Sequence, residues 1–305
     1  MHRFLQFSFI LSFLLLYHGL TDQVFCQDIK QLRQSEDSLA GLVALMQQSN
    51  SDSTRLVYNE IFRTVLEEML MLPESGKYPF SKLKNLVRIT SEDKRIFIVH
   101  WNLPMKTGKQ RYFGYLISGE PKSLRLTRLT DVSDSLQFPD TTFLDAGRWF
   151  GALYYKVIMN NHPDGKKSYT LLGWSGKNSM ITQKVIEVLT LDDQDNPRFG
   201  LRIFPNYLTG NMTRIIFRYD ATTAMSLKYE EQTISSTRKW NSGKRAFDQT
   251  LVITSLIVFD HLAPIDPQLE GQYQFYVPSG DIFDGFIQEK GKWMFLPSID
   301  ARNKH

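Results

Sequence analysis

The spacing of apolar residues changes near residue 86, and this change constrains the fold more than any other feature of the chain. Between residues 29 and 70 apolar residues recur every three or four positions, as on one face of an amphipathic helix. From about residue 86 onward apolar and polar residues alternate, and β-branched and aromatic residues become frequent. Because successive side chains of a strand point to opposite faces, the sequence predicts a mainly β chain preceded by helices.

Two helices are predicted between residues 27 and 73. One apolar stripe covers residues 29–46, a polar loop follows at residues 49–53, and a second stripe covers residues 56–70 before Pro73. We expect these helices to form an antiparallel hairpin, separate from a β domain that covers residues 86–305.

About a dozen strands are predicted in the β domain, and most are joined by short turns. Asp164-Gly165 and the region around Gly291 are hairpin signals. Short connections favour antiparallel neighbours, since a parallel pair needs a long crossover. The sequence therefore predicts an antiparallel β-meander that forms a sandwich or a barrel-like sheet. In this meander residues 198–204 pair with 183–191, and residues 213–220 pair with 225–232. A propeller is disfavoured, because the strands show no repeat of blade length.

The first 26 residues resemble a secretory signal peptide. Arg3 supplies a positive charge, residues 4–16 are apolar, and Val24 and Cys26 occupy the −3 and −1 positions of a cut before Gln27. Because Phe25 is bulky, lipidation of Cys26 is disfavoured. The alternative is a retained membrane anchor, although the apolar run is short for a span. We expect a periplasmic or secreted protein without a transmembrane segment after cleavage.

Composition excludes several classes of protein. Cys26 is the single cysteine, so cleavage after it leaves no disulfide and no thiol chemistry. The formal net charge is +4 and the charges are interspersed, which argues against a nucleic-acid partner. A hydrophobic content of 42% is enough for a sizeable core.

The stretch "TLLGWSGKNS" at residues 170–179 contains the strongest catalytic signal, and it is incomplete. A nucleophile elbow around Ser175 needs glycine two positions later, where Lys177 stands. A phosphate loop needs Ser or Thr after Lys177 and a glycine upstream at the right distance. We expect a tight turn after a strand, in which Gly176 or Asn178 adopts a positive φ.

The histidines do not show the spacing of a metal site, and no cofactor is predicted. His100 lies in an apolar strand and is expected to be a satisfied core imidazole, whereas His162 is expected to be exposed in a turn. Asp260-His261 follows a buried run. It either forms a dyad that serves a distant serine or pins a turn through side-chain to backbone hydrogen bonds.

Acidic residues offer two further alternatives. The loop from Asp192 to Asn196 has oxygens suited to calcium but lacks the glycine and distal glutamate of an EF-hand, so a solvated hairpin turn is favoured. Asp281 and Asp284 are expected to flank another turn. A glycosidase needs two carboxylates that face one cleft, and spacing alone does not show whether such a pair exists. The candidates for that pair are Glu187, Asp220 and Glu230.

The stretch at residues 236–247 is the main candidate for ligand binding. Four cations surround an aromatic residue in what reads as a long loop between strands: Arg238, Lys239, Trp240, Lys244 and Arg245. Such a loop is suited to an anionic polymer or to lipid headgroups, with the indole stacking on a ring. A solvated insertion is the alternative.

Several stretches together resemble a family of uncharacterised secreted and periplasmic proteins of Gram-negative bacteria. The resemblance covers about the second half of the chain, and it implies export and a shared architecture but no catalytic residue. The stretches are residues 154–158, 169–176, 184–189, 198–200, 214–229, 257–264 and 284–293.

The sequence favours an exported, non-catalytic envelope or secreted β protein that binds a partner or an anionic ligand. The alternative is a hydrolase that acts on a periplasmic or extracellular polymer. A cleft with converging acids would favour the hydrolase, and an aromatic or basic patch would favour the binding protein.

Overall fold

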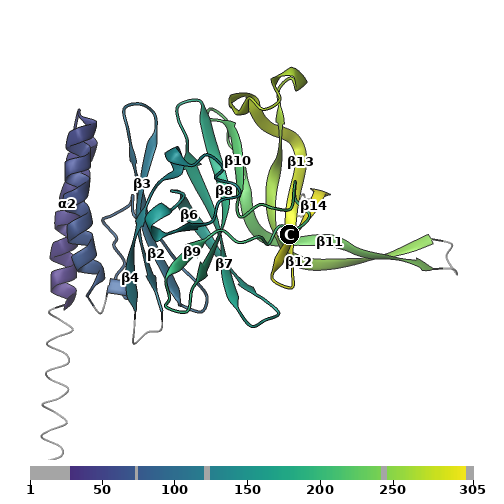
Figure 1. Cartoon of the computed structure of the whole chain (residues 1–305), viewed down its shortest axis with the longest axis horizontal. Helices are drawn as coiled ribbons and strands as arrows, with labels where there is room; N and C mark the ends of the chain where they lie inside the picture. The colour runs from purple at the N-terminus through teal and green to yellow at the C-terminus, as the bar shows by residue number, and fades with distance from the viewer. Residues whose placement is uncertain (1–27, 73–74, 120–123, 242–245, 300–305) are drawn as a thin grey trace, which may run out of the picture. The chain divides into compact units, whose positions relative to one another are not determined.

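The computed structural model describes residues 28–72, 75–119, 124–241 and 246–299, without the side chains of residues 235–251 (Figure 1). The chain divides into two compact units, Met1–Leu86 and Val87–His305. Each unit is described by itself.

The first unit contains the two predicted helices. Helix α1 covers the described residues 28–48, helix α2 is Asp52–Leu70, and the 3-10 helix η1 is Ser75–Lys77. Both helices bury one apolar face, whose members recur at helical spacing: Leu32, Leu39 and Met46 from α1, and Phe62, Leu66 and Met69 from α2. The predicted helical hairpin is confirmed.

A buried carboxylate ties the segment after α2 to α1. Glu36 is 2% exposed and accepts hydrogen bonds from the Tyr78 hydroxyl and from the Lys82 backbone N–H, both at 2.7 Å. Burial and the bond to Glu36 raise the pKa of Tyr78 to about 12. Asp37 adds an ion pair with the Lys82 side chain.

The second unit consists of three antiparallel sheets. Sheet 1 has the order β1-β2-β3-β4 and sheet 3 has the order β11-β12-β13-β14. Sheet 2 has the order β5-β9-β8-β7-β6, and β10 also pairs with β8. The strands of sheet 1 are β1 (Val87–Thr90), β2 (Ile96–Pro104), β3 (Gln110–Ser118) and β4 (Arg125–Thr130). Those of sheet 2 are β5 (Leu144–Asp145), β6 (Leu153–Asn161), β7 (Lys167–Gly176), β8 (Ile181–Leu191), β9 (Pro197–Phe199) and β10 (Ile215–Asp220). Those of sheet 3 are β11 (Leu227–Asn241), β12 (Ala246–Pro264), β13 (Tyr276–Glu289) and β14 (Lys292–Ile299).

Four short 3-10 helices lie in the connections of this unit: η2 (Ser133–Ser135), η3 (Ala146–Arg148), η4 (Pro267–Leu269) and η5 (Tyr273–Phe275).

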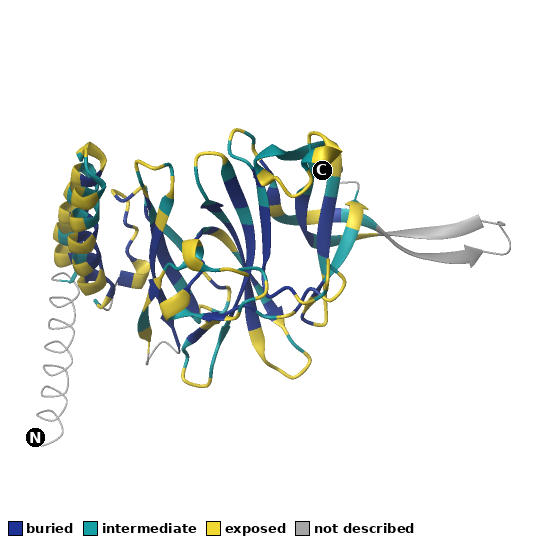
Figure 2. Cartoon of the chain, turned by 45° about the horizontal axis from the view of Figure 1, so that its top comes forward, coloured by how far each residue is buried: buried dark blue, intermediate teal, exposed yellow. Residues whose placement is uncertain are grey.

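Sheet 2 is the middle layer of the unit, because both of its faces are buried (Figure 2). Leu171 and Val185 belong to a core shared with sheet 1, whereas Leu172 and Ile186 belong to a core shared with sheet 3. Burial on both faces explains why β7 and β8 are almost continuously buried instead of alternating. The mainly β prediction is confirmed, and none of the three sheets closes into a barrel.

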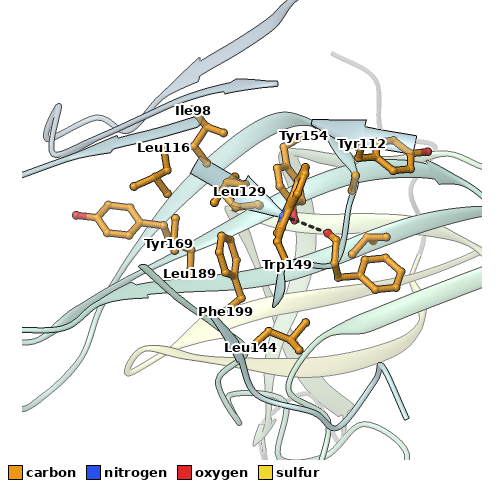
Figure 3. Close-up of a cluster of buried hydrophobic side chains, with 14 of the residues drawn as sticks. Ile98, Tyr112, Leu116, Leu129, Leu144, Trp149, Tyr154, Tyr169, Leu189 and Phe199 are labelled. Carbon is orange, nitrogen blue, oxygen red and sulfur yellow. Dashed lines mark hydrogen bonds between the residues drawn. The ribbon is translucent and has the colours of Figure 1, made fainter. Parts of the chain in front are cut away.

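Aromatic side chains fill the core between sheets 1 and 2 (Figure 3). Trp149 donates its indole N–H to the Tyr154 hydroxyl at 2.9 Å, so the polar atoms of two buried rings satisfy each other. Ile98, Leu116 and Leu129 of sheet 1 belong to this cluster, and Leu189 and Phe199 join it from sheet 2 (Figure 3).

One strand pairing and one strand length differ from the prediction, whereas the predicted pairing of residues 183–191 with the strand that begins near Arg198 is confirmed. Residues 213–220 were expected to pair with 225–232, but β10 pairs with β8 in sheet 2 and β11 pairs with β12 in sheet 3. The turn after Asp220 is short, yet it carries the chain from one layer to the next. Strand β9 ends at Phe199, because Gly200 takes a φ of +96° and the backbone leaves the sheet, so only the start of the predicted strand at 198–204 forms.

Candidate functional site

Ser175 is a strand residue. It lies in β7 opposite Gln183 of β8 and is 3% exposed. The hairpin turn follows at residues 177–180, where the Asn178 side chain accepts hydrogen bonds from the N–H groups of Met180 and Ile181, both at 2.9 Å. The expected positive φ at Gly176 or Asn178 was wrong, since the asparagine side chain closes the turn. The stretch is structural, as the sequence predicted.

His100 is a core imidazole, as predicted, and its Nε2 is the ring nitrogen with a hydrogen-bond partner, whereas its Nδ1 is buried without one. It is fully buried, and its Nε2 accepts a hydrogen bond from the Tyr154 N–H at 2.6 Å. Burial lowers the pKa of His100 to about 3, so the ring is neutral near pH 7. His162 lies in the β6–β7 turn, as predicted, but it is half-buried and its Nε2 lies 2.8 Å from the Ser168 hydroxyl, so the expected exposure was wrong. Gly291 packs against its ring.

Glu187 forms a buried ion pair with Arg214. The Arg214 Nε lies 2.7 Å from the Glu187 carboxylate, and both side chains have no exposed surface. Arg214 also donates to the carbonyl oxygens of Thr142, at 2.8 Å, and Pro139. Burial raises the pKa of Glu187, against the attraction of Arg214. The pair holds the segment before β5 against sheet 2 and is closed to a substrate.

Glu187 and Asp220 do not form a carboxylate pair. Asp220 lies opposite Ile181, six residues along β8 from Glu187, which separates them by about 20 Å. A glycosidase pair is separated by roughly 5–9.5 Å, so these two acids do not form such a pair. Glu230 lies opposite Leu256, five residues along β12 from His261, which separates the acid from the imidazole by about 16 Å.

The acidic loop after β8 is a hairpin turn. The Asp192 carboxylate accepts hydrogen bonds from the N–H groups of Asn196 and Gln194, at 2.9 and 3.0 Å, and these bonds lower its pKa. Asp195 takes a φ of +58° and pairs with Arg95 at 2.7 Å. The solvated turn favoured by the sequence is confirmed. In the part of the chain that the structure describes, no group of three His, Cys, Asp or Glu residues is placed to hold a metal ion.

A half-open cavity of about 790 Å³ lies beside this turn and the β6–β7 turn. Two ion pairs neutralise charges in or next to it: Arg95 with Asp195, and Lys167 with Asp93 at 2.9 Å. Burial would raise the pKa of Asp93, but bonds from Lys167, Ser91 and neighbouring donors outweigh it and lower the pKa to about 2. The cavity is a polar crevice between turns, and its charges mainly bind each other.

His261 forms a dyad that the sequence did not reveal. Its Nδ1 lies 2.7 Å from the carboxylate of Asp284 in β13, whose other oxygen accepts from the Ser298 N–H at 3.0 Å. Asp284 was expected in a turn, but its side chain is buried in the sheet at 7% exposure, whereas that of His261 is 47% exposed. Asp260 instead accepts from the Ser226 N–H at 2.7 Å, so it pins the β10–β11 connection, as one alternative predicted.

The dyad sits where sheet 3 is irregular. The β12–β13 register shifts between Asp260 and Leu262, and the β13–β14 register shifts between Phe283 and Gly285. Bulges redirect side chains, which explains how two strand residues with no sequence signal come to face each other.

The basic stretch lies in a β-hairpin and not in the expected loop. Strands β11 and β12 remain paired through Arg238↔Gln249, Lys239↔Asp248 and Trp240↔Phe247, up to Asn241↔Ala246. Lys244 and Arg245 lie outside the described residues. Strand β13 pairs with β12 only from Leu256 onward. Residues 231–241 and 246–255 therefore form a two-stranded extension of sheet 3, called the ribbon, which projects beyond β13 and β14 (Figure 1).

Comparison with protein-family models, with curated proteins and with solved structures finds no match to this chain. The resemblance to secreted and periplasmic proteins therefore stays a prediction. The signal-peptide prediction for residues 1–26 lies outside the described residues. None of the helices that the structure describes combines the length and the apolar character needed to cross a membrane.

Proposed function

We propose that this chain is an exported, non-catalytic binding protein that holds an anionic ligand at the outer end of the ribbon. The observation that supports this most is the ribbon itself. Residues 246–255 of β12 have β11 as their strand partner, whereas residues 256–259 lie between β11 and β13 and the end of β12 pairs with β13.

Two apolar side chains of the ribbon are exposed at its inner end, although Gln232 is buried there. Val252 is 38% exposed and Ile253 is 61% exposed, although both are large apolar residues. A two-stranded hairpin is only marginally stable by itself in water, and its free edges invite other chains. Contact with a second molecule would stabilise residues 246–255, whose strand partner is β11, and would explain why the chain extends there.

The composition of the outer end supports an anionic ligand. Arg238, Lys239, Lys244 and Arg245 fall within eight residues, and the register places the single acid of this region, Asp248, opposite Lys239. A local surplus of positive charge attracts and orients anions. Trp240 adds an aromatic ring able to stack on a sugar or to enter a lipid headgroup layer.

The test is retention of the full chain on an immobilised acidic polysaccharide and on vesicles that contain an anionic lipid, at low and at high salt. We expect Trp240→Ala and the double change Arg238→Gln/Lys239→Gln to weaken retention several-fold, with less effect at high salt. Lys292→Gln, an exposed lysine of β14, is the matched control. Unchanged retention in both ribbon variants would rule out this proposal.

The His261–Asp284 dyad favours a second function, hydrolysis of an envelope polymer. A buried carboxylate that orients an exposed imidazole is the arrangement of a general base. No hydrogen bond joins a serine or threonine hydroxyl to His261 in the described part of the chain, so a water molecule would be the nucleophile. Hydrolysis of polymer substrates that disappears in His261→Asn but persists in Lys292→Gln would establish this alternative.

A further inference from the structure

Two lysines lie over tyrosine rings where the edge strand β6 of sheet 2 approaches the edge strand β11 of sheet 3. The Lys184 Nζ is 4.9 Å from the centre of the Tyr155 ring, and the Lys156 Nζ is 5.7 Å from the centre of the Tyr229 ring. The Tyr155 hydroxyl donates to the Leu227 carbonyl oxygen at 2.8 Å. Since β11 begins at Leu227, both lysines lie at the root of the hairpin that ends in the ribbon.

Neither lysine has an acidic partner. Among the ion pairs of the described residues, none includes Lys156 or Lys184. Lys184 is half-buried and has Trp174 and Phe217 as its direct partners on the two neighbouring strands. Burial lowers the pKa of Lys184 accordingly. A partly desolvated ammonium group without a carboxylate is unfavourable, and a bound anion removes that cost.

The register gives the spacing of the two lysines. Lys156 lies opposite Leu172, and Lys184 lies opposite Trp174 on the other side of β7. Two strands and two residues separate them, which corresponds to roughly 12 Å between their Cα atoms. Tyr155 lies at a bulge of β6 between Tyr154 and Lys156, and it is 42% exposed.

We propose that Lys156, Lys184 and Tyr155 form a binding site for an acidic polysaccharide at the root of the hairpin. Two separated cations suit a ligand whose negative charges repeat, and an exposed tyrosine offers a ring on which a sugar packs. The hydroxyl bond to Leu227 holds Tyr155 against sheet 3, where it is not free to insert into a bilayer. This inference rests on the proposed function, because the site shares its anionic ligand with the ribbon.

The site predicts a linked pH dependence. A carboxylate bound beside Lys184 stabilises the ammonium form and raises the pKa of Lys184 toward its ordinary range. In the pH range where Lys184 of the unbound protein is partly deprotonated, binding is coupled to the uptake of a proton. The affinity therefore falls as pH rises through that range. The titratable groups that the structure places beside Lys184 and Tyr155 include the Tyr155 and Tyr219 hydroxyls, and burial raises the pKa of both.

The experiment is calorimetric titration of the full chain with a uronic acid oligosaccharide at low salt, with a neutral oligosaccharide of equal length as the control ligand. We expect Lys156→Gln and Lys184→Gln each to weaken binding about five-fold and the double variant more than ten-fold. Lys292→Gln, with the same loss of charge, should bind as the parent does. The neutral oligosaccharide should not bind measurably.

The ribbon variants separate the two proposals. If Lys156→Gln and Lys184→Gln bind like the parent, the root site is refuted, whether or not Trp240→Ala loses binding. If the root variants lose binding and the ribbon variants do not, the root site stands and the ribbon proposal fails. If binding to anionic vesicles is weakened by Lys156→Gln and Lys184→Gln as much as binding to the oligosaccharide is, a polysaccharide is refuted as the specific ligand.

Chemical modification of lysines in the parent protein tests the same proposal without a variant, in case a variant fails to fold. Acetylation with an N-hydroxysuccinimide ester, mapped by mass spectrometry, should modify Lys184 more slowly when the acidic oligosaccharide is present. Lys292 should react at the same rate with and without it. Equal reaction of Lys184 in both conditions would overturn the proposal.

Discussion

The imidazole Nε2 of His100 in β2 accepts a hydrogen bond from the backbone N–H of Tyr154 in β6, at 2.6 Å. One neutral histidine thus connects sheet 1 to sheet 2 in the middle of their shared core. Tyr154 adjoins a β-bulge, where the ladder of backbone hydrogen bonds is interrupted. The histidine satisfies a buried N–H group that the strand leaves without a regular partner.

His100 should make the fold sensitive to acid. With a pKa of about 3 in the fold and an ordinary value of 6.5, the unfolded chain binds a proton that the folded chain does not. Stability therefore falls as pH drops from 6.5 toward 3, by up to about 1.4 kcal/mol per pH unit from this group. Urea unfolding at pH 7.5, 5.5 and 4.5 should show a shallower decline in His100→Gln than in the parent. An identical decline would contradict this account.

Asp93 should act in a lower pH window. Its pKa of about 2 lies below the ordinary 3.8, so its contribution is complete above pH 4 and disappears as pH falls from 4 to 2. The shift corresponds to about 2 kcal/mol of stability at pH 7. We expect Asp93→Asn to lose this amount at pH 7 in urea unfolding. The control is Asp193→Asn, an exposed acid of the β8–β9 turn that should change stability by less than about 0.5 kcal/mol.

Removing the charge of Glu187 should be among the most damaging single changes. Arg214 would remain fully buried without its carboxylate, a loss of about 3–5 kcal/mol. The double change Glu187→Leu/Arg214→Leu should recover part of that loss but not all, because the carbonyl oxygens of Pro139 and Thr142 would lack their donor. Thermal unfolding of the three proteins measures this order, and a double variant worse than Glu187→Gln would contradict it.

Shortening the ribbon should leave the three-layer body intact. Replacing residues 234–252 with Asn-Gly joins Thr233 to Ile253, its register partner, through a two-residue turn. Because Val252 is exposed and β11 is the strand partner of residues 246–255, we expect the free energy of unfolding to change by about 1 kcal/mol or less. A loss above about 3 kcal/mol would mean that the ribbon packs on the body.

The local features of this fold could be predicted from sequence. The hairpins at Asp164-Gly165 and Gly291 form where turn residues interrupt alternating strands, and both glycines have φ near +80°. The period of two also identifies the strands, because it depends only on the geometry of the extended chain. The turn after Ser175 was also predicted, although its closure by the Asn178 side chain was not. The helix pair follows in the same way from spacings of three and four.

The candidate sites depended on contacts that sequence spacing does not contain. Asp284 lies 23 residues from His261, and Arg214 lies 27 residues from Glu187, so only the packing of strands brings each pair together. The basic stretch contains Ser, Asn and Gly and was interpreted as a loop, but backbone pairing with residues 246–249 makes it a strand. Lys156 and Lys184 gave no signal at all, since an unpaired lysine is recognisable only after its neighbours are known.

Both helices, most of the strands and most hairpin turns follow from the amino-acid sequence, because period and turn chemistry act over a few residues. The tertiary structure alone decided that β10 and β11 belong to different sheets, that the middle sheet is covered on both faces, and which charges lack a partner. The physical reason is that burial and pairing between layers depend on residues far apart in the chain, whose contacts form only when the whole core packs.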